Sequence, residues 1–186
     1  MRISGHASLA LIGIIATVAG VLYSTPAAAR GDFQIPGHGT LRLAVPTGWK
    51  VDSQPIGDPA AVAIHIVPES GNGFDIQVTS VWLDADRLSK TSSQLIKDST
   101  QQAANSLLSH SVETAATIQE MRGTESVGSS FALTDRDPGP GEFKYLTQGI
   151  FLTGEALSSF TILYRAPKPQ EVTDALRMFT EAKYVK

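Results

Sequence analysis

Residues alternate between apolar and polar from position 74 to position 82, and this alternation constrains the fold of the chain more than any other feature. Four of the five alternate positions are apolar, namely Phe74, Ile76, Val78 and Trp82. The positions between them carry Asp75, Gln77 and Thr79. Successive side chains of a β-strand point to opposite faces of a sheet. The pattern therefore predicts a long strand with one buried face, which belongs to a sheet that other elements must cover.

Shorter segments with the same two-residue period lie on either side of this strand. They cover residues 41–45, 62–66, 127–133, 143–151 and 160–164, with a further extended piece at 115–121. Pro46-Thr47-Gly48 predicts a turn, after which Trp49 and Val51 begin another short strand. Strands that follow one another through short turns favour antiparallel pairing. We therefore expect an antiparallel sheet with helices packed on it, which is an α+β fold.

The apolar period changes to that of a helix in two places. Between Ser89 and Ser109 the apolar residues at helical spacing are Leu95, Ile96, Ala103 and Leu107. Asp84 or Asp86 can cap the start of this predicted helix. Near the C-terminus, Pro169 suits a first helical turn. The residues after it form a complete apolar stripe, at Val172, Ala175, Leu176 and Phe179. Both helices are one-sided and are expected to cover the sheet.

The first 29 residues are expected to form a secretory signal peptide. Arg2 supplies a positive start, residues 9–22 are apolar or small, and Ala27 to Ala29 offer an A-x-A cleavage site before Arg30. An apolar stretch of about 14 residues is short for a membrane span, which needs roughly 20. We therefore expect cleavage between Ala29 and Arg30, with an uncleaved anchor as the alternative. Residues 30–186 then form a single exported domain, periplasmic or secreted, with no stable membrane insertion.

Composition excludes several classes of function. The chain has no cysteine, which removes disulfides, thiolate metal ligands and a thiol nucleophile. Its formal net charge of −3 becomes −4 for residues 30–186, because Arg2 is the only charged residue in the leader. A negative domain without a basic run argues against a nucleic-acid partner.

The sequence contains no recognised catalytic or metal-binding motif. The string around Ser126 has the wrong spacing for the G-x-S-x-G nucleophile elbow, so we expect Ser126 to be a polar residue at a strand start. His38, His65 and His110 form no H-E-x-x-H pattern. We expect His65 to be a hydrogen-bonded or exposed sheet residue. Residues 135–141 carry two aspartates but are interrupted by prolines, so we expect a solvated loop and no calcium site. No catalytic residue, cofactor or metal is predicted.

Several segments together resemble a known family. They are Phe33-Gln34-Ile35-Pro36, the strand that reaches Val45-Pro46-Thr47-Gly48-Trp49, the central amphipathic helix, Lys144-Tyr145-Leu146-Thr147-Gln148, and the closing strand and helix. In this order they resemble the PsbP-like α/β/α sandwich superfamily over most of residues 33–185. The resemblance implies an antiparallel sheet with helices on both faces. It also implies no enzyme activity, because family members with known roles act by binding partners.

Two functional hypotheses follow. The first is an exported, non-enzymatic domain that binds a protein or a cell-envelope component. The alternative is a small-molecule carrier or hydrolase with a pocket between helix and sheet, which a well-formed apolar cavity with converging polar groups would favour. Trp49 and Trp82 are expected in the core because each lies in an apolar alternation. Trp49 is also a candidate partner-binding residue, because turns expose side chains.

Overall fold

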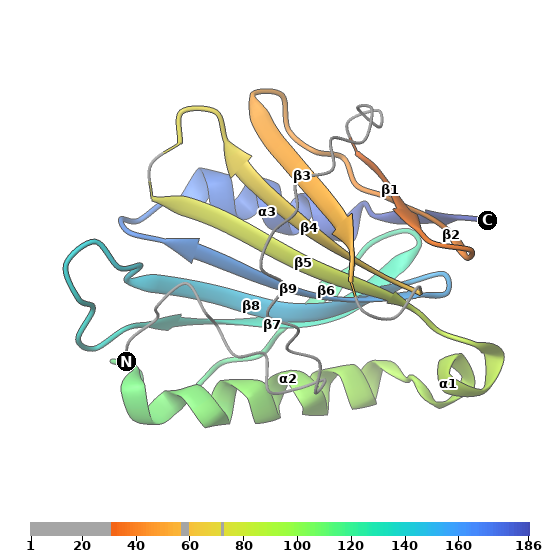
Figure 1. Cartoon of the computed structure of the whole chain (residues 1–186). Coiled ribbons are helices and arrows are strands. Elements are labelled where there is room, and N and C mark those ends of the chain that lie inside the picture. Colours follow the sequence, from red (N-terminus) through yellow and green to blue (C-terminus); the bar gives the residue numbers. More distant parts are fainter. Residues whose placement is uncertain (1–30, 57–59, 72) are drawn as a thin grey trace.

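The computed structural model describes residues 31–56, 60–71 and 73–186 (Figure 1). The predicted signal peptide and its cleavage site at Ala29 and Arg30 lie outside the described residues. The described part is an α+β fold built on a large antiparallel sheet, as the alternating segments predict.

The large sheet has seven strands in the order β3-β4-β5-β9-β8-β7-β6, and every pairing in it is antiparallel. The strands are β3 (Trp49–Pro55), β4 (Ala61–Pro68), β5 (Phe74–Trp82), β6 (Gln119–Arg122), β7 (Ser126–Thr134), β8 (Tyr145–Thr153) and β9 (Ala156–Tyr164). The strongest alternation in the sequence forms β5. This strand lies near the middle of the sheet, where β4 and β9 pair with it on either side.

A second sheet has three strands in the order β1-β2-β10. These strands are β1 (Asp32–Ile35), β2 (Gly39–Arg42) and β10 (Lys183–Val185). The sheet joins the two ends of the described chain, because Tyr184 pairs with Leu41 and Leu41 pairs with Phe33. Leu41 and Phe33 are buried in the main hydrophobic core, which they share with the large sheet.

The helical region after β5 differs from the single helix predicted over residues 89–109. It contains α1 (Ala85–Lys90), α2 (Ser93–Leu107) and the 3₁₀ turn η1 (Leu108–His110). The Asp84 side chain caps α1 by accepting a hydrogen bond from the Arg87 N–H. Ser92 caps α2 in the same way, by accepting from the Leu95 N–H. This second cap divides the predicted helix into two. Met121, which lies in the segment expected to be extended at 115–121, belongs to the short edge strand β6.

Helices α2 and α3 contact different side chains of the sheet. In α3 (Pro169–Thr180), the buried side chain of Phe179 stacks on Phe151 of β8 and packs on Phe160 of β9. In α2, Ala104 belongs to a smaller core with Leu146 of β8, and Ile96 and Thr100 are also buried. The prediction that Leu95 lies on the buried stripe of α2 is wrong, since 48% of its surface is exposed.

Two further expectations are corrected. Trp82 is only partly buried at the edge of the main core, because it is the last residue of β5. Residues 135–141 are not solvated throughout. Asp135 is buried, accepts the Asp137 N–H and forms an isolated β-bridge with Ser111, so it fixes the start of the loop.

Candidate ligand cavity beneath helix α2

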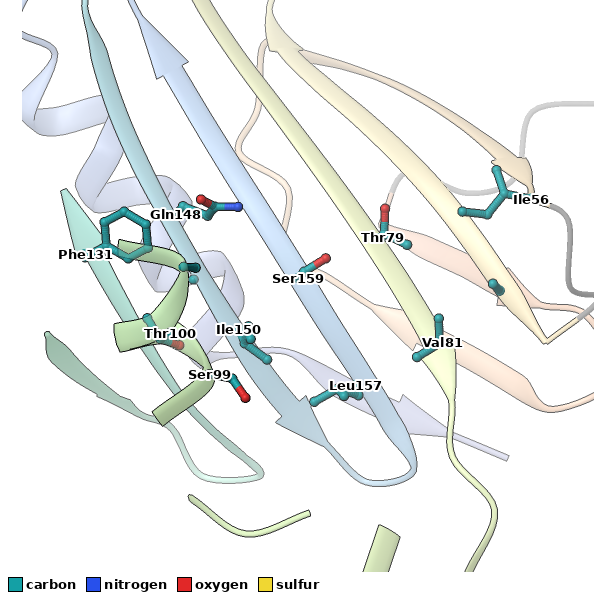
Figure 2. Close-up of a pocket in the computed structure, with 13 residues that line it drawn as sticks. Ile56, Thr79, Val81, Ser99, Thr100, Phe131, Gln148, Ile150, Leu157 and Ser159 are labelled. Atoms are coloured by element: carbon teal, nitrogen blue, oxygen red, sulfur yellow. The ribbon is translucent and has the colours of Figure 1, made fainter. Parts of the chain in front are cut away.

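A cavity of about 210 Å³ lies between α2 and the face of the large sheet that this helix partly covers (Figure 2). Its lining residues come from the position just after β3, strands β4, β5, β7, β8 and β9, and helix α2. They are Ile56, Ala61, Thr79, Val81, Ser99, Thr100, Ala103, Phe131, Gln148, Gly149, Ile150, Leu157 and Ser159. An apolar cavity of roughly 150 Å³ is enough to hold benzene. This cavity therefore has room for an aromatic ring or a short alkyl group.

The hollow exists because short side chains face each other across it. On the helix the lining side chains are Ser99, Thr100 and Ala103, and on the sheet Ala61 and Ser159 are equally short. Buried interiors are normally packed to crystal density, so a helix that meets a sheet through small residues leaves a gap unless larger neighbours fill it. The larger side chains of Phe131 and Leu157 also line this gap.

Polar groups reach the cavity without partners from the described chain. Thr79, Ser159 and Gln148 lie on the adjacent strands β5, β9 and β8 (Figure 2). None of their side chains hydrogen-bonds to another described residue, whereas Thr100 donates to the Ile96 carbonyl and accepts from Ser129. Among the described lining residues none is charged. The cavity is therefore suited to an apolar group that carries a few hydrogen-bonding atoms.

One buried hydroxyl beside the cavity is also unsatisfied. Thr161 is 1% exposed and its Oγ1 has no hydrogen-bond partner among the residues that the structure describes. In the register of the sheet it lies between Gln77 of β5 and Gln148 of β8. A buried hydroxyl without a partner costs about 1–3 kcal/mol relative to a bonded one.

A shallow groove continues from the cavity across β5, β4 and β3. Thr79 lines both hollows, and the groove also contains Asp52, Gln54, His65 and Gln77. Its volume is about 360 Å³. The cavity and the groove adjoin at Thr79, and together they are called the hollow, which is apolar beneath α2 and polar over β3 and β4.

The polar end is organised by a histidine and a carboxylate. His65 Nε2 lies 2.7 Å from Asp75 Oδ2, and Gln77 donates to Asp75 Oδ1 at 3.2 Å. The hydrogen bond to Asp75 raises the pKa of His65, and the negative charges of Asp75 and Asp52 act in the same direction against partial burial. The expectation that His65 is a hydrogen-bonded sheet residue is confirmed, and its side chain is half exposed.

The other candidate residues lie apart from this hollow. Ser126 begins β7 as expected, and its Oγ donates to the Thr180 carbonyl at 2.6 Å. Trp49 is 7% exposed and packs edge-on against Phe74, in the core position that its alternation predicts. A partner contact at Trp49 stays a prediction. His110 is exposed in η1.

A second cluster was not predicted from the sequence. The His38 ring stacks on Trp82 at 3.8 Å, and the Trp82 Nε1–H donates to Glu155. Tyr184 donates to the His38 carbonyl, and Lys186 pairs with Glu155. Lys186 chiefly, and then the Trp82 donor, lower the pKa of Glu155. These contacts attach the small sheet to the turn between β8 and β9. Only Trp82, at the end of the predicted strand over residues 74–82, indicated part of this cluster in the sequence.

Within residues 31–56, 60–71 and 73–186, no three His, Asp or Glu side chains gather in a way that could hold a metal ion. None of the helices in the same described ranges is long and apolar enough to cross a membrane.

Comparison with known proteins gives a structural match only. No protein-family model matches the chain, and no curated protein sequence matches it. The structure is similar to the solution structure of cyanobacterial PsbP (CyanoP) from Synechocystis sp. PCC 6803, with a TM-score of 0.51 and 9% sequence identity. The match covers 89% of this chain and 98% of that one. The chain therefore has the PsbP-like fold, as the sequence resemblance indicates.

Proposed function

We propose that this protein is a non-enzymatic exported domain that binds a small, largely apolar molecule in the cavity beneath α2. The observation that carries the proposal is the cavity itself, which combines apolar walls with the unpartnered polar side chains of Thr79, Ser159 and Gln148. A largely preformed apolar pocket with a few convergent polar groups is the usual form of a small-molecule site. Residues 30–186 would form one α/β/α sandwich, released after cleavage at Ala29.

The chemistry of the lining supports binding over catalysis. General acid–base catalysis needs a titratable group within hydrogen-bond reach of the reacting atoms. The described lining of the cavity contains hydroxyls and an amide but no acid, base or histidine. His65 lies in the adjoining groove and Ser126 is bonded to the Thr180 carbonyl, so the two do not form a nucleophile–base pair.

A test should vary the size of the cavity. Ala103→Leu places a larger side chain on the α2 wall, whereas Gln102→Leu places the same apolar side chain on an exposed position of the same helix without adding bulk to the cavity. Titration of the purified protein with octanol, followed by amide NMR shifts, should show binding that Ala103→Leu weakens at least tenfold and Gln102→Leu leaves unchanged. The proposal fails if octanol does not bind, or if both variants bind it as the parent protein does.

A protein-binding or accessory role is the second candidate, and the PsbP-like fold favours it. A pull-down from the exporting cell with the purified protein as bait would test this role. A stoichiometric protein partner that binds Ala103→Leu as well as the parent would support the second candidate. In that case Trp49→Ala tests whether this candidate residue contributes to the contact.

A further inference from the structure

We propose that the ligand is an amphipath whose apolar part lies beneath α2 and whose polar end is a protonated amine over Asp52 and His65. This inference rests on the proposed function of the cavity and specifies the class of ligand. It follows from the order in which polar and apolar side chains appear along the hollow, and from the charges at its polar end.

Strands β3 and β5 show the same polarity gradient on the face that carries the hollow. Along β5 the side chains on this face are Asp75, Gln77, Thr79 and Val81. Along β3 and just beyond it they are Lys50, Asp52, Gln54 and Ile56. From Asp52 and from Asp75 onward, each strand passes from a carboxylate through uncharged polar groups to an aliphatic side chain. Because residues two apart share a face, both gradients lie on one surface.

The register of the sheet aligns these gradients. Asp52 pairs with His65, which pairs with Gln77, and this is the polar row. Gln54 pairs with Ala63, which pairs with Thr79. The third row includes Ala61, paired with Val81 at the apolar end. The hollow therefore changes from charged to apolar in one direction.

The alanines of β4 make the surface concave. Ala63 occupies the middle of the second row and Ala61 the middle of the third, and the neighbouring side chains in these rows are larger. A bound chain can lie over these two positions and pass from the groove into the cavity at Thr79, which lines both. The small cavity would hold the apolar part of the ligand, and the groove would hold the remainder.

The charges at the polar end favour a cation. Asp52 and His65 are the charged or titratable side chains among the described residues that line the groove, and Asp75 lies against His65. A protonated His65 neutralises Asp75 and leaves the charge of Asp52, whereas a neutral His65 leaves two negative charges. No hydrogen bond or ion pair joins Asp52 to another described residue. Lys50 shares this face of β3 but does not line the groove, and its charge offsets part of the negative charge. Asp52 lines the groove without an ion-pair partner among the described residues, so the polar end favours an amine over a carboxylate or phosphate, most strongly when His65 is neutral.

The test compares probes that differ only in the polar end: octylamine, octanol and octanoate, titrated into the purified protein by calorimetry at pH 7. We expect octylamine to bind best and octanoate at least tenfold more weakly. Asp52→Asn should weaken octylamine about two- to fivefold, as expected for one exposed charge, and leave octanol unchanged. Asp137→Asn removes an equal charge from the exposed part of the loop between β7 and β8 and should change neither.

The outcomes separate the two proposals. If none of the probes binds, the proposed function fails and the amphipath inference fails with it. If the probes bind and Ala103→Leu weakens them, the cavity is the site. In that case octanoate binding as well as octylamine, or an Asp52→Asn variant that keeps its amine affinity, overturns the inference about the polar end and leaves the cavity proposal standing.

Discussion

Truncation of Phe179 to alanine should destabilise the protein strongly, because this side chain links α3 to the large sheet. Phe179 is fully buried, and its ring centroid lies 4.3 Å from that of Phe160 and 5.2 Å from that of Phe151. Replacing a buried Phe by Ala typically costs about 3–5 kcal/mol, from lost burial and the cavity left behind. Two aromatic contacts favour the upper half of that range. Such a loss is a large share of a total stability of about 5–15 kcal/mol.

Equilibrium unfolding in urea, followed by circular dichroism, measures this effect. Val112→Ala is the control, since Val112 is 58% exposed and its truncation should change the free energy of unfolding by less than about 0.5 kcal/mol. Phe179→Leu should fall between the two, because it retains part of the buried volume and loses both ring contacts. A Phe179→Ala variant that unfolds at the same urea concentration as Val112→Ala would refute the docking of α3 on the sheet.

Three further predictions concern the His65–Asp75 pair, the contact between β7 and β8, and the cleavage site. Asp75 raises the pKa of His65, so the pair should stabilise the fold fully below about pH 6.5 and lose this effect as the pH rises through the raised pKa. The difference in unfolding free energy between the parent and His65→Gln should be below about 1 kcal/mol for this half-exposed pair and should shrink with increasing pH. A difference that grows with pH would contradict the assignment. Gly149→Ala should cost about 1–3 kcal/mol in the urea assay, since its added Cβ would lie 2.6 Å from the Phe160 ring and against the Ser129 carbonyl, and an unchanged midpoint would show that the β7–β8 contact is looser than described. N-terminal sequencing of protein from the exported fraction should begin at Arg30, and a chain that begins at Met1 would remove the argument for export.

The strands could be predicted because their apolar residues recur with a period of two in the sequence. The full set of residues that α2 buries could not be predicted in this way. Ile96 is buried as predicted, but hydrophobicity also favours Leu95, whereas the helix buries Thr100 and Ala104. Thr100 can occupy a buried position because its hydroxyl donates to the Ile96 carbonyl one turn earlier and accepts from Ser129. A polar residue satisfied in this way does not appear in a hydrophobic pattern, so the predicted face is rotated from the observed one.

The burial of Asp135, at the start of the loop at residues 135–141, was missed for a similar reason. Its composition is that of a solvated turn, with two aspartates, prolines and glycines. Asp135 is nevertheless buried, since the chain pairs there with Ser111 and the Asp135 carboxylate accepts the Asp137 N–H. Ser111 lies 24 positions earlier in the sequence, and local propensity carries no information about such a contact.

The cavity depends on which strands become neighbours, and this is why its residues were not identified in advance. Thr79 and Ser159 lie far apart in the sequence and become a register pair only when β9 inserts beside β5. A pocket between helix and sheet could be anticipated as a class of site, because a one-sided helix must rest on a sheet, but its lining could not. The polarity gradient differs in this respect. Its residues are consecutive on one face of β5, where Asp75, Gln77 and Thr79 are followed by Val81. From the alternation alone, this face is simply the one opposite the core. Strand β5 therefore has one face buried in the core and a second face whose side chains change from polar to apolar along the strand. The second surface is explained if a ligand, rather than bulk water, lies against it.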